Sequence, residues 1–130
     1  MTEHRKILVV DDQVEIRELA ETILATEGYD LKTAGSGEEA LDAVLGESFD
    51  LVLLDINMPR MSGWETLRLI RADGGLDDLA VVMFSIKGEI RDKSQGMQLG
   101  AVDYITKPFQ VDELVSRVRD VFMSLEGAAS

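Results

Sequence analysis

Short apolar runs alternate along the chain with longer stretches whose apolar residues recur at helical spacing. The runs at 7–10, 51–54 and 79–84 are too short for helices and have the length of strands buried on both faces. The segments 29–33 and 101–106 instead alternate apolar and polar residues, which indicates strands with one solvated face. We therefore expect five strands, with the continuous runs at the centre of a sheet and the alternating segments at its edges.

Helical periodicity fills the intervals between these strands. The pattern predicts helices over about 14–27, 36–46, 64–72, 89–99 and 110–125. Gly28 is suited to end the first helix. Ser36 with Glu39, and Ser62 with Glu65, carry the spacing of a capping box at a helix start. Glycines flank or interrupt the segment 89–99, so we expect this helix to be the least rigid.

The alternation of strands and helices predicts an α/β fold. It indicates a single doubly wound, five-stranded parallel sheet with helices on both faces. The central and edge assignments are satisfied by the strand order 2-1-3-4-5, the flavodoxin-like (βα)5 arrangement. In that order the topological switch point lies between the first and third strands, where such folds bind their ligands.

Length and charge limit the possible classes of function. The 130 residues fit one domain, with a core over about 6–125 and a tail or truncated linker over 126–130. The 25 acids against 13 bases give a net charge of −12, which opposes direct binding to nucleic acid or to anionic membranes. Cysteine is absent, and no apolar run reaches the ~20 residues of a membrane span, so we expect a cytoplasmic protein.

Acidic residues follow two of the central strands. Asp11 and Asp12 end the first strand and Asp55 ends the third, so the expected order brings all three to one pocket. Taken alone, the Asp11–Asp12 pair is better explained as a helix cap. Three neighbouring carboxylates repel one another unless a cation lies between them, and Mg²⁺ suits them best, with Mn²⁺ as a substitute. We interpret Asp55 as a phosphoryl acceptor.

A hydroxyl and an ammonium are expected on the other side of this pocket. Ser85 ends the fourth strand and Lys107 ends the fifth. Such groups neutralise phosphate oxygens. Taken alone, Ser85 is more simply a turn residue and Lys107 a solvated lysine, so their interpretation depends on Asp55.

Four segments together resemble the receiver domain of two-component response regulators, a family that includes chemotaxis receivers. They are VVDD at 9–12, LLDINMP at 53–59, Ser85, and DYITKPF at 103–109, and the resemblance extends over about 6–125. It implies a phosphorylation-activated signalling switch rather than an enzyme. The implied partners are a sensor histidine kinase or phosphotransfer protein, and a downstream target protein or fused output domain.

The resemblance also implies roles for individual residues. Asp55 accepts the phosphoryl group of a phosphohistidine. Asp12 and Asp55 ligate Mg²⁺ directly, Asp11 does so through water, and the backbone carbonyl of Asn57 completes the protein ligands. Ser85 and Lys107 bind phosphoryl oxygens.

In the same family, Tyr104 corresponds to an aromatic residue whose ring turns inward on activation. The resemblance implies a change in the surface around the fourth helix, fifth strand and fifth helix, in a monomer or a phosphorylation-dependent dimer. It also raises the expectation that the Lys107–Pro108 bond is cis. Ile86 departs from the family, which usually has a small residue there, and we expect it to alter the lifetime of the phosphoryl group or the choice of donor.

Two other functions compete with the signalling switch. A magnesium-dependent phosphohydrolase also uses acids at strand ends, but no second loop acid follows Asp55 to act as acid or base. A degenerate receiver that only docks is expected to have lost a key residue, and none is lost. We therefore favour the switch.

Overall fold

The computed structural model describes residues 5–86 and 100–129, including all of their side chains except those of 85, 86 and 127–129. The elements in chain order are β1 (Lys6–Val10), α1 (Val14–Thr26), β2 (Asp30–Ala34), α2 (Gly37–Gly46), β3 (Leu51–Asp55), α3 (Gly63–Ala72), the 3₁₀ helix η1 (Gly74–Leu76), β4 (Ala80–Ile86), β5 (Asp103–Lys107) and α5 (Val111–Ala129). The helix predicted over 89–99 lies outside the described residues.

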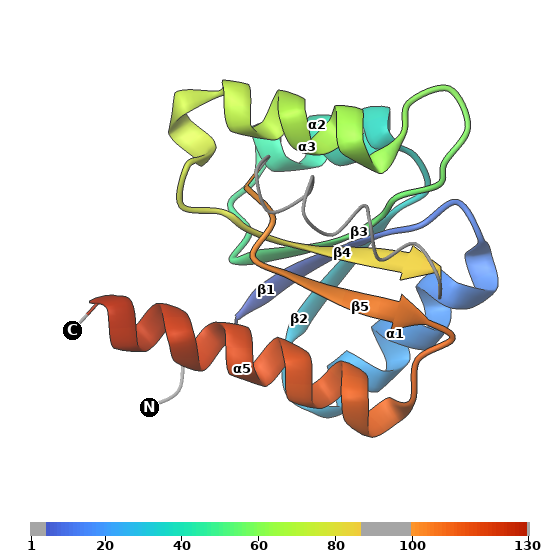
Figure 1. Cartoon of the computed structure of the whole chain (residues 1–130), viewed down its shortest axis with the longest axis vertical. Coiled ribbons are helices and arrows are strands. Elements are labelled where there is room, and N and C mark those ends of the chain that lie inside the picture. The colour runs from blue at the N-terminus through green and yellow to red at the C-terminus, as the bar shows by residue number, and fades with distance from the viewer. Residues whose placement is uncertain (1–4, 87–99, 130) are drawn as a thin grey trace.

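The strands form one parallel sheet in the order β2-β1-β3-β4-β5, which confirms the predicted topology (Figure 1). In the register of the central strands, Val10 lies opposite Leu54. The acids that follow these two residues, Asp11 and Asp55, therefore leave the sheet at the same level. The fold thus places the candidate chemistry at the carboxyl edge, beside the switch point.

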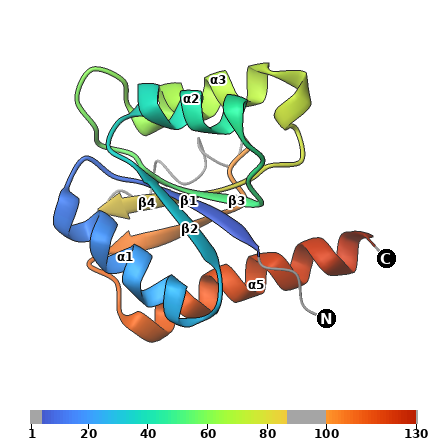
Figure 2. The ribbon, with the colours of Figure 1, turned by 180° about the vertical axis from the view of Figure 1, so that it is seen from behind.

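Helices cover both faces of the sheet. Helices α2 and α3 lie on one face, and α1 and α5 lie on the other, as the two opposite views show (Figures 1 and 2). In β1, Leu8 and Val10 pack on the α2 side while Ile7 and Val9 pack on the α5 side. Because successive strand residues alternate between two covered faces, a central strand must be apolar throughout, as the sequence pattern indicated.

The edge strand β5 is more deeply buried than predicted. Its neighbouring residues Tyr104 and Ile105 are 7% and 0% exposed, so the prediction of a solvated face is wrong at this point. Tyr104 packs in the core on the α2 and α3 side, with its ring centroid 6.5 Å from that of Trp64, and Ile105 packs on the α5 side. The sequence pattern missed this because the covering groups come from distant segments.

The helix ends follow local capping chemistry, with small differences from prediction. Helix α1 ends one residue early, at Thr26, and Gly28 adopts φ +93°, which favours glycine. Ser62 and Glu65 form the complete capping box of α3. Helix α5 continues to Ala129, beyond the predicted end at 125.

The capping box predicted for α2 is only half formed. Ser36 Oγ accepts a hydrogen bond from the backbone N–H of Glu39 at 3.1 Å, as expected. The Glu39 carboxylate, however, accepts from the backbone N–H of Gly35 at 3.0 Å rather than from Ser36. Glu39 thus fixes the turn before the helix.

In the part of the chain that the structure describes, we find no helix with the length and apolarity of a membrane span.

Candidate functional site

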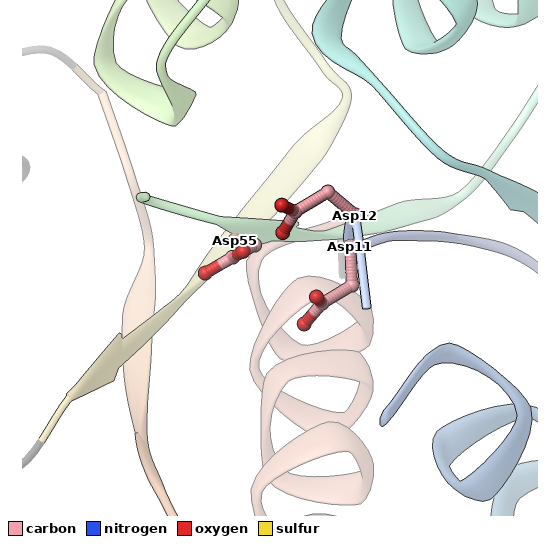
Figure 3. A group of neighbouring side chains, drawn as sticks. All are labelled: Asp11, Asp12 and Asp55. Carbon is pink, nitrogen blue, oxygen red and sulfur yellow. The ribbon is translucent and has the colours of Figure 1, made fainter. Parts of the chain in front are cut away.

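Three carboxylates gather at the carboxyl edge of the sheet. Asp11 and Asp12 follow β1 and Asp55 ends β3, and one oxygen of each lies within 4.8 Å of the others (Figure 3). Asp11 is 0% exposed and Asp55 is 4% exposed, whereas Asp12 is open to solvent. The structure therefore brings together the acids that the strand order was expected to unite.

Asp11 is fixed by hydrogen bonds to its backbone and side chain. Its Oδ1 accepts from the N–H of Gln13 at 2.9 Å, and its Oδ2 accepts from Nζ of Lys107 at 2.7 Å. Its own N–H donates to the carbonyl of Ala34 at 3.2 Å, and its carbonyl accepts from Nη1 of Arg17 at 2.8 Å. Arg17 was not among the predicted site residues, because nothing in helical periodicity shows that its side chain turns back to the preceding loop.

Asp55 is an acid in a mostly buried setting. Its Oδ1 accepts from Nζ of Lys107 at 3.0 Å and from the N–H of Asn57 at 3.4 Å. Burial raises its pKa from 3.8 to about 6, with the neighbouring charge of Asp11 adding to the rise and the Lys107 hydrogen bond opposing it. At neutral pH the carboxyl group is mostly ionised, yet it is less costly to protonate than an exposed aspartate.

Lys107 brings a positive charge into direct contact with two of the carboxylates. Burial alone lowers its pKa, but the hydrogen bonds to Asp11 and Asp55 outweigh burial, and the net pKa is raised. The ammonium therefore stays charged at neutral pH. The peptide bond to Pro108 is cis, as the family resemblance suggested.

Helix α3 begins directly against the backbone of Asp55. The N–H of Gly63 donates to the carbonyl of Ile56 at 2.8 Å. A Cβ atom at Gly63 would stand 2.8 Å from Cα of Ile56 and closer still to the carbonyl oxygen of Asp55. Glycine is required here because the backbone of residues 55 and 56 approaches so closely. In the sequence, Gly63 was recognisable only as the residue that follows the helix cap Ser62.

Of the remaining predicted site residues, the structure locates the side chains of two and does not describe those of the other two. Asn57 is exposed beside Asp55, and Tyr104 is buried against α3. Ser85 belongs to β4 and is paired with Thr106, but its side chain lies outside the described part of the chain, as does that of Ile86. The roles assigned to the hydroxyl of Ser85 and to Ile86 stay predictions.

The donor chemistry fits a divalent cation. Among the described residues, three carboxylates face the ammonium of Lys107, so negative charge is in excess in this part of the site. Carboxylate oxygens are the ligands that Mg²⁺ prefers, and the exposed Asp12 leaves room for the waters that Mg²⁺ retains. This acidic cluster is typical of the magnesium site of receiver domains.

A cavity of about 780 Å³ lies at the opposite, amino edge of the sheet. Its lining includes Arg5, Phe49, Asp50 and Leu76, which belong to segments outside the carboxyl edge. None of its lining residues is an acid of the cluster or Lys107. The candidate chemistry is therefore separate from this cavity.

Comparison with known proteins gives relatives of one kind. Residues 7–119 match the family model of the response regulator receiver domain. The chain is 44% identical over 116 residues to the transcriptional regulatory protein CpxR homolog of Haemophilus influenzae, covering 89% of this chain and 49% of that protein. It is 41% identical over 124 residues to the probable transcriptional regulator ycf27 of Guillardia theta, covering 95% and 48%. The chain thus spans about half the length of these curated relatives.

Solved structures agree with this result. The chemotaxis response regulator CheY4 of Vibrio cholerae superposes with a TM-score of 0.87 at 30% identity, over 92% of this chain and 99% of that one. A putative response regulator from Chloroflexus aurantiacus gives 0.87 at 33% identity, over 92% and 98%. The chain belongs to the response regulator receiver family of two-component signalling and is a phosphoacceptor domain.

Proposed function

We propose that Asp55 accepts a phosphoryl group from the phosphohistidine of a sensor histidine kinase or phosphotransfer protein. The observation that supports this most is the setting of its carboxylate. Asp55 lies at the tip of a central strand, within 4.8 Å of Asp11 and Asp12, and is hydrogen-bonded to Lys107. The site combines a nucleophile, a cation-binding set and a fixed positive charge.

Asp55 suits the acceptor role better than Asp11. Both carboxylate oxygens of Asp11 accept hydrogen bonds, from Gln13 and from Lys107. Within the described part of the chain, the hydrogen bonds to Asp55 both end on Oδ1. Its Oδ2 is therefore the oxygen we assign to the attack on phosphorus.

The transfer is a displacement at phosphorus. A carboxylate oxygen of Asp55 forms the new P–O bond while the P–N bond to the donor imidazole breaks, and the electron pair of that bond returns to the imidazole nitrogen. Ionised Asp55 supplies the nucleophile at neutral pH, since its pKa is about 6. Lys107 would pair with a phosphoryl oxygen in place of part of its present contact with Asp55, and this contact supports the assignment.

A divalent cation belongs to this proposal. Asp12 and Asp55 would hold Mg²⁺, or Mn²⁺ in its place, directly, with Asp11 acting through water and Asn57 through its backbone carbonyl. When bound, the ion neutralises charge shared by the carboxylate and the phosphoryl oxygens. The protein's own contribution is to position these groups.

We extend the proposal to the output. Ser85 would bind a phosphoryl oxygen, and Tyr104 would couple this event to the surface around the predicted fourth helix, β5 and α5. Tyr104 is already buried beside Trp64, so the coupling would act through packing on the α3 face. The two curated relatives named above, a transcriptional regulatory protein and a probable transcriptional regulator, are each about twice as long as this chain, which supports a downstream or fused output partner.

The proposal is tested with acetyl phosphate and Mg²⁺. We expect one hydroxylamine-sensitive phosphoryl group per chain, and none in the variant Asp55→Asn, whose side chain has nearly the same shape. A phosphorylated histidine kinase should likewise transfer its phosphoryl label to the wild-type chain in the presence of Mg²⁺, and should not transfer it to Asp55→Asn. Sustained turnover of external phosphomonoesters would instead indicate a hydrolase, and no labelling by either donor would indicate a docking module.

A further inference from the structure

Arg17 of α1 points back to the loop that carries the acids. Its Nη1 donates a hydrogen bond of 2.8 Å to the backbone carbonyl of Asp11. This carbonyl is part of the peptide group that joins Asp11 to Asp12. Arg17 is half-buried, whereas its neighbours Glu15 and Glu18 are exposed. The guanidinium therefore restrains the backbone between two of the three acids.

The same guanidinium lies over the turn that follows β2. A Cβ atom at Gly35 would stand 3.1 Å from Nη1 of Arg17 and 3.8 Å from Oε1 of Glu39. The N–H of Gly35 donates to that Glu39 oxygen at 3.0 Å. Arg17 thus fills the space that the missing side chain of Gly35 leaves, and it connects the β1–α1 loop to a turn fixed by α2.

We propose that Arg17 is a positioning residue for cation binding: it holds Asp11 and Asp12 in the arrangement that a divalent ion requires. This inference rests on the proposed function. Asp12 has the greatest need of such support, because its exposed carboxylate is placed by the backbone that Arg17 restrains. Groups that orient metal ligands without touching the metal commonly set its affinity.

Charge and position make opposite predictions for Arg17. A positive charge near three carboxylates repels an incoming cation, so removing the charge alone should tighten Mg²⁺ binding. Removing the restraint on the Asp11 carbonyl should weaken it. The direction of the change in affinity therefore separates positioning from simple electrostatics.

Calorimetric titration with Mg²⁺ alone measures this direction. We expect Arg17→Met to weaken Mg²⁺ binding on the order of 10-fold, and Arg17→Lys, which keeps the charge and one donor, to restore part of it. Gly35→Ala, which displaces the guanidinium slightly, should give a smaller loss. The control Arg68→Met removes an exposed arginine from α3 and should leave the affinity unchanged. In metal-free protein, the Gln13 amide should exchange hydrogen faster in Arg17→Met.

The variant Asp12→Asn shows whether Mg²⁺ binds at the proposed cation site, because it should then weaken binding. If it does, equal or tighter Mg²⁺ binding by Arg17→Met would overturn the inference and leave the proposed function standing. A wild-type chain that binds no Mg²⁺, or binds it independently of Asp12, would overturn the proposed function as well. A lower melting temperature with unchanged Mg²⁺ affinity would show a merely structural role and contradict positioning. If Arg17→Met does not fold, the same calorimetric titration of Arg17→Lys and Gly35→Ala tests the inference. Mg²⁺ binding as tight as in wild type in both variants would overturn it.

Discussion

The Nζ atom of Lys107 lies 3.0 Å from Oδ1 of Asp55, a residue 52 positions earlier in the chain. The same atom lies 2.7 Å from Oδ2 of Asp11. One ammonium thus bridges two buried carboxylates that leave neighbouring strands at the same level. Among the described residues, Lys107 is the charged group that hydrogen-bonds to both carboxylates, and it offsets their repulsion.

Lys107→Met should destabilise the metal-free protein by about 2 kcal/mol at neutral pH, because it leaves two buried carboxylates without their counterion. This value is below the usual cost of breaking a buried pair, since Asp55 can take up a proton. Added Mg²⁺ should recover much of the loss by supplying positive charge at the same place. Urea denaturation with and without Mg²⁺ measures both effects.

The matched control is Lys32→Met. Lys32 pairs with Glu47 at 2.8 Å, but its side chain is 58% exposed. We expect a change below about 1 kcal/mol that does not depend on Mg²⁺. Equal losses in the two variants would contradict the special role given to the bridge between Asp11 and Asp55.

The raised pKa of Asp55 predicts how stability depends on pH. Burial raises this pKa from 3.8 to about 6, so the folded state binds a proton that the unfolded state has released. The contribution of Asp55 to the free energy of unfolding is therefore greatest below about pH 4 and is lost as the pH rises through about 6.

Asp55→Asn removes this titration while it keeps the side-chain shape. Relative to wild type, the metal-free variant should gain stability between about pH 4 and pH 6, reaching on the order of 3 kcal/mol at neutral pH. Denaturation curves measured across this range provide the test. A difference between the two proteins that does not vary with pH would contradict the raised pKa.

Gly63→Ala should destabilise the protein by about 3 kcal/mol, because a Cβ atom would overlap the backbone of Asp55 and push α3 away from β3. Phosphorylation should slow as well, since the acceptor loop must shift. In the control Gly46→Ala, at the end of α2, a Cβ atom meets nothing within 4 Å, so stability should stay the same or rise slightly. Thermal unfolding of both variants tests the close approach of Gly63 to the backbone of Asp55. Similar melting temperatures for the two variants would contradict it.

Ile86 provides a prediction from the sequence alone. A branched residue stands there in place of the small residue usual in the family, next to Ser85 at the end of β4. Ile86→Ala should change the rate at which the phosphoryl group is gained or lost, because it widens access to that group. Time courses with acetyl phosphate measure both rates, and equal rates in the two proteins would remove the idea.

The division into central and edge strands was predictable because burial on two faces leaves a direct trace in sequence, and the order 2-1-3-4-5 is the known flavodoxin-like order that satisfies this division. The runs before Asp11 and Asp55 are apolar without interruption, and only central strands require this. Once the order is known, the meeting of the acids follows from the geometry of a parallel sheet. Lys107 was predicted near Asp55, but its shorter contact with Asp11 was not.

Features that depend on tertiary contacts were missed. The second partner of Lys107, the bond from Arg17 to the Asp11 carbonyl, and the approach of Gly63 to Asp55 each join segments whose distance is set by packing. Glu39 matched a local motif but found a different backbone N–H, because the turn at Gly35 brings that group within reach. Local patterns identify candidate residues, whereas their partners are settled by the fold.

Reduction of the phosphorylated protein with borohydride identifies the residue that carries the phosphoryl group, which we assign to Asp55. The reagent converts an aspartyl phosphate to homoserine, which peptide mass spectrometry then locates. We predict homoserine at position 55 alone, only when both donor and Mg²⁺ were present. Homoserine at position 11 or 12, or stable phosphate on a serine or threonine instead, would show that Asp55 is not the acceptor.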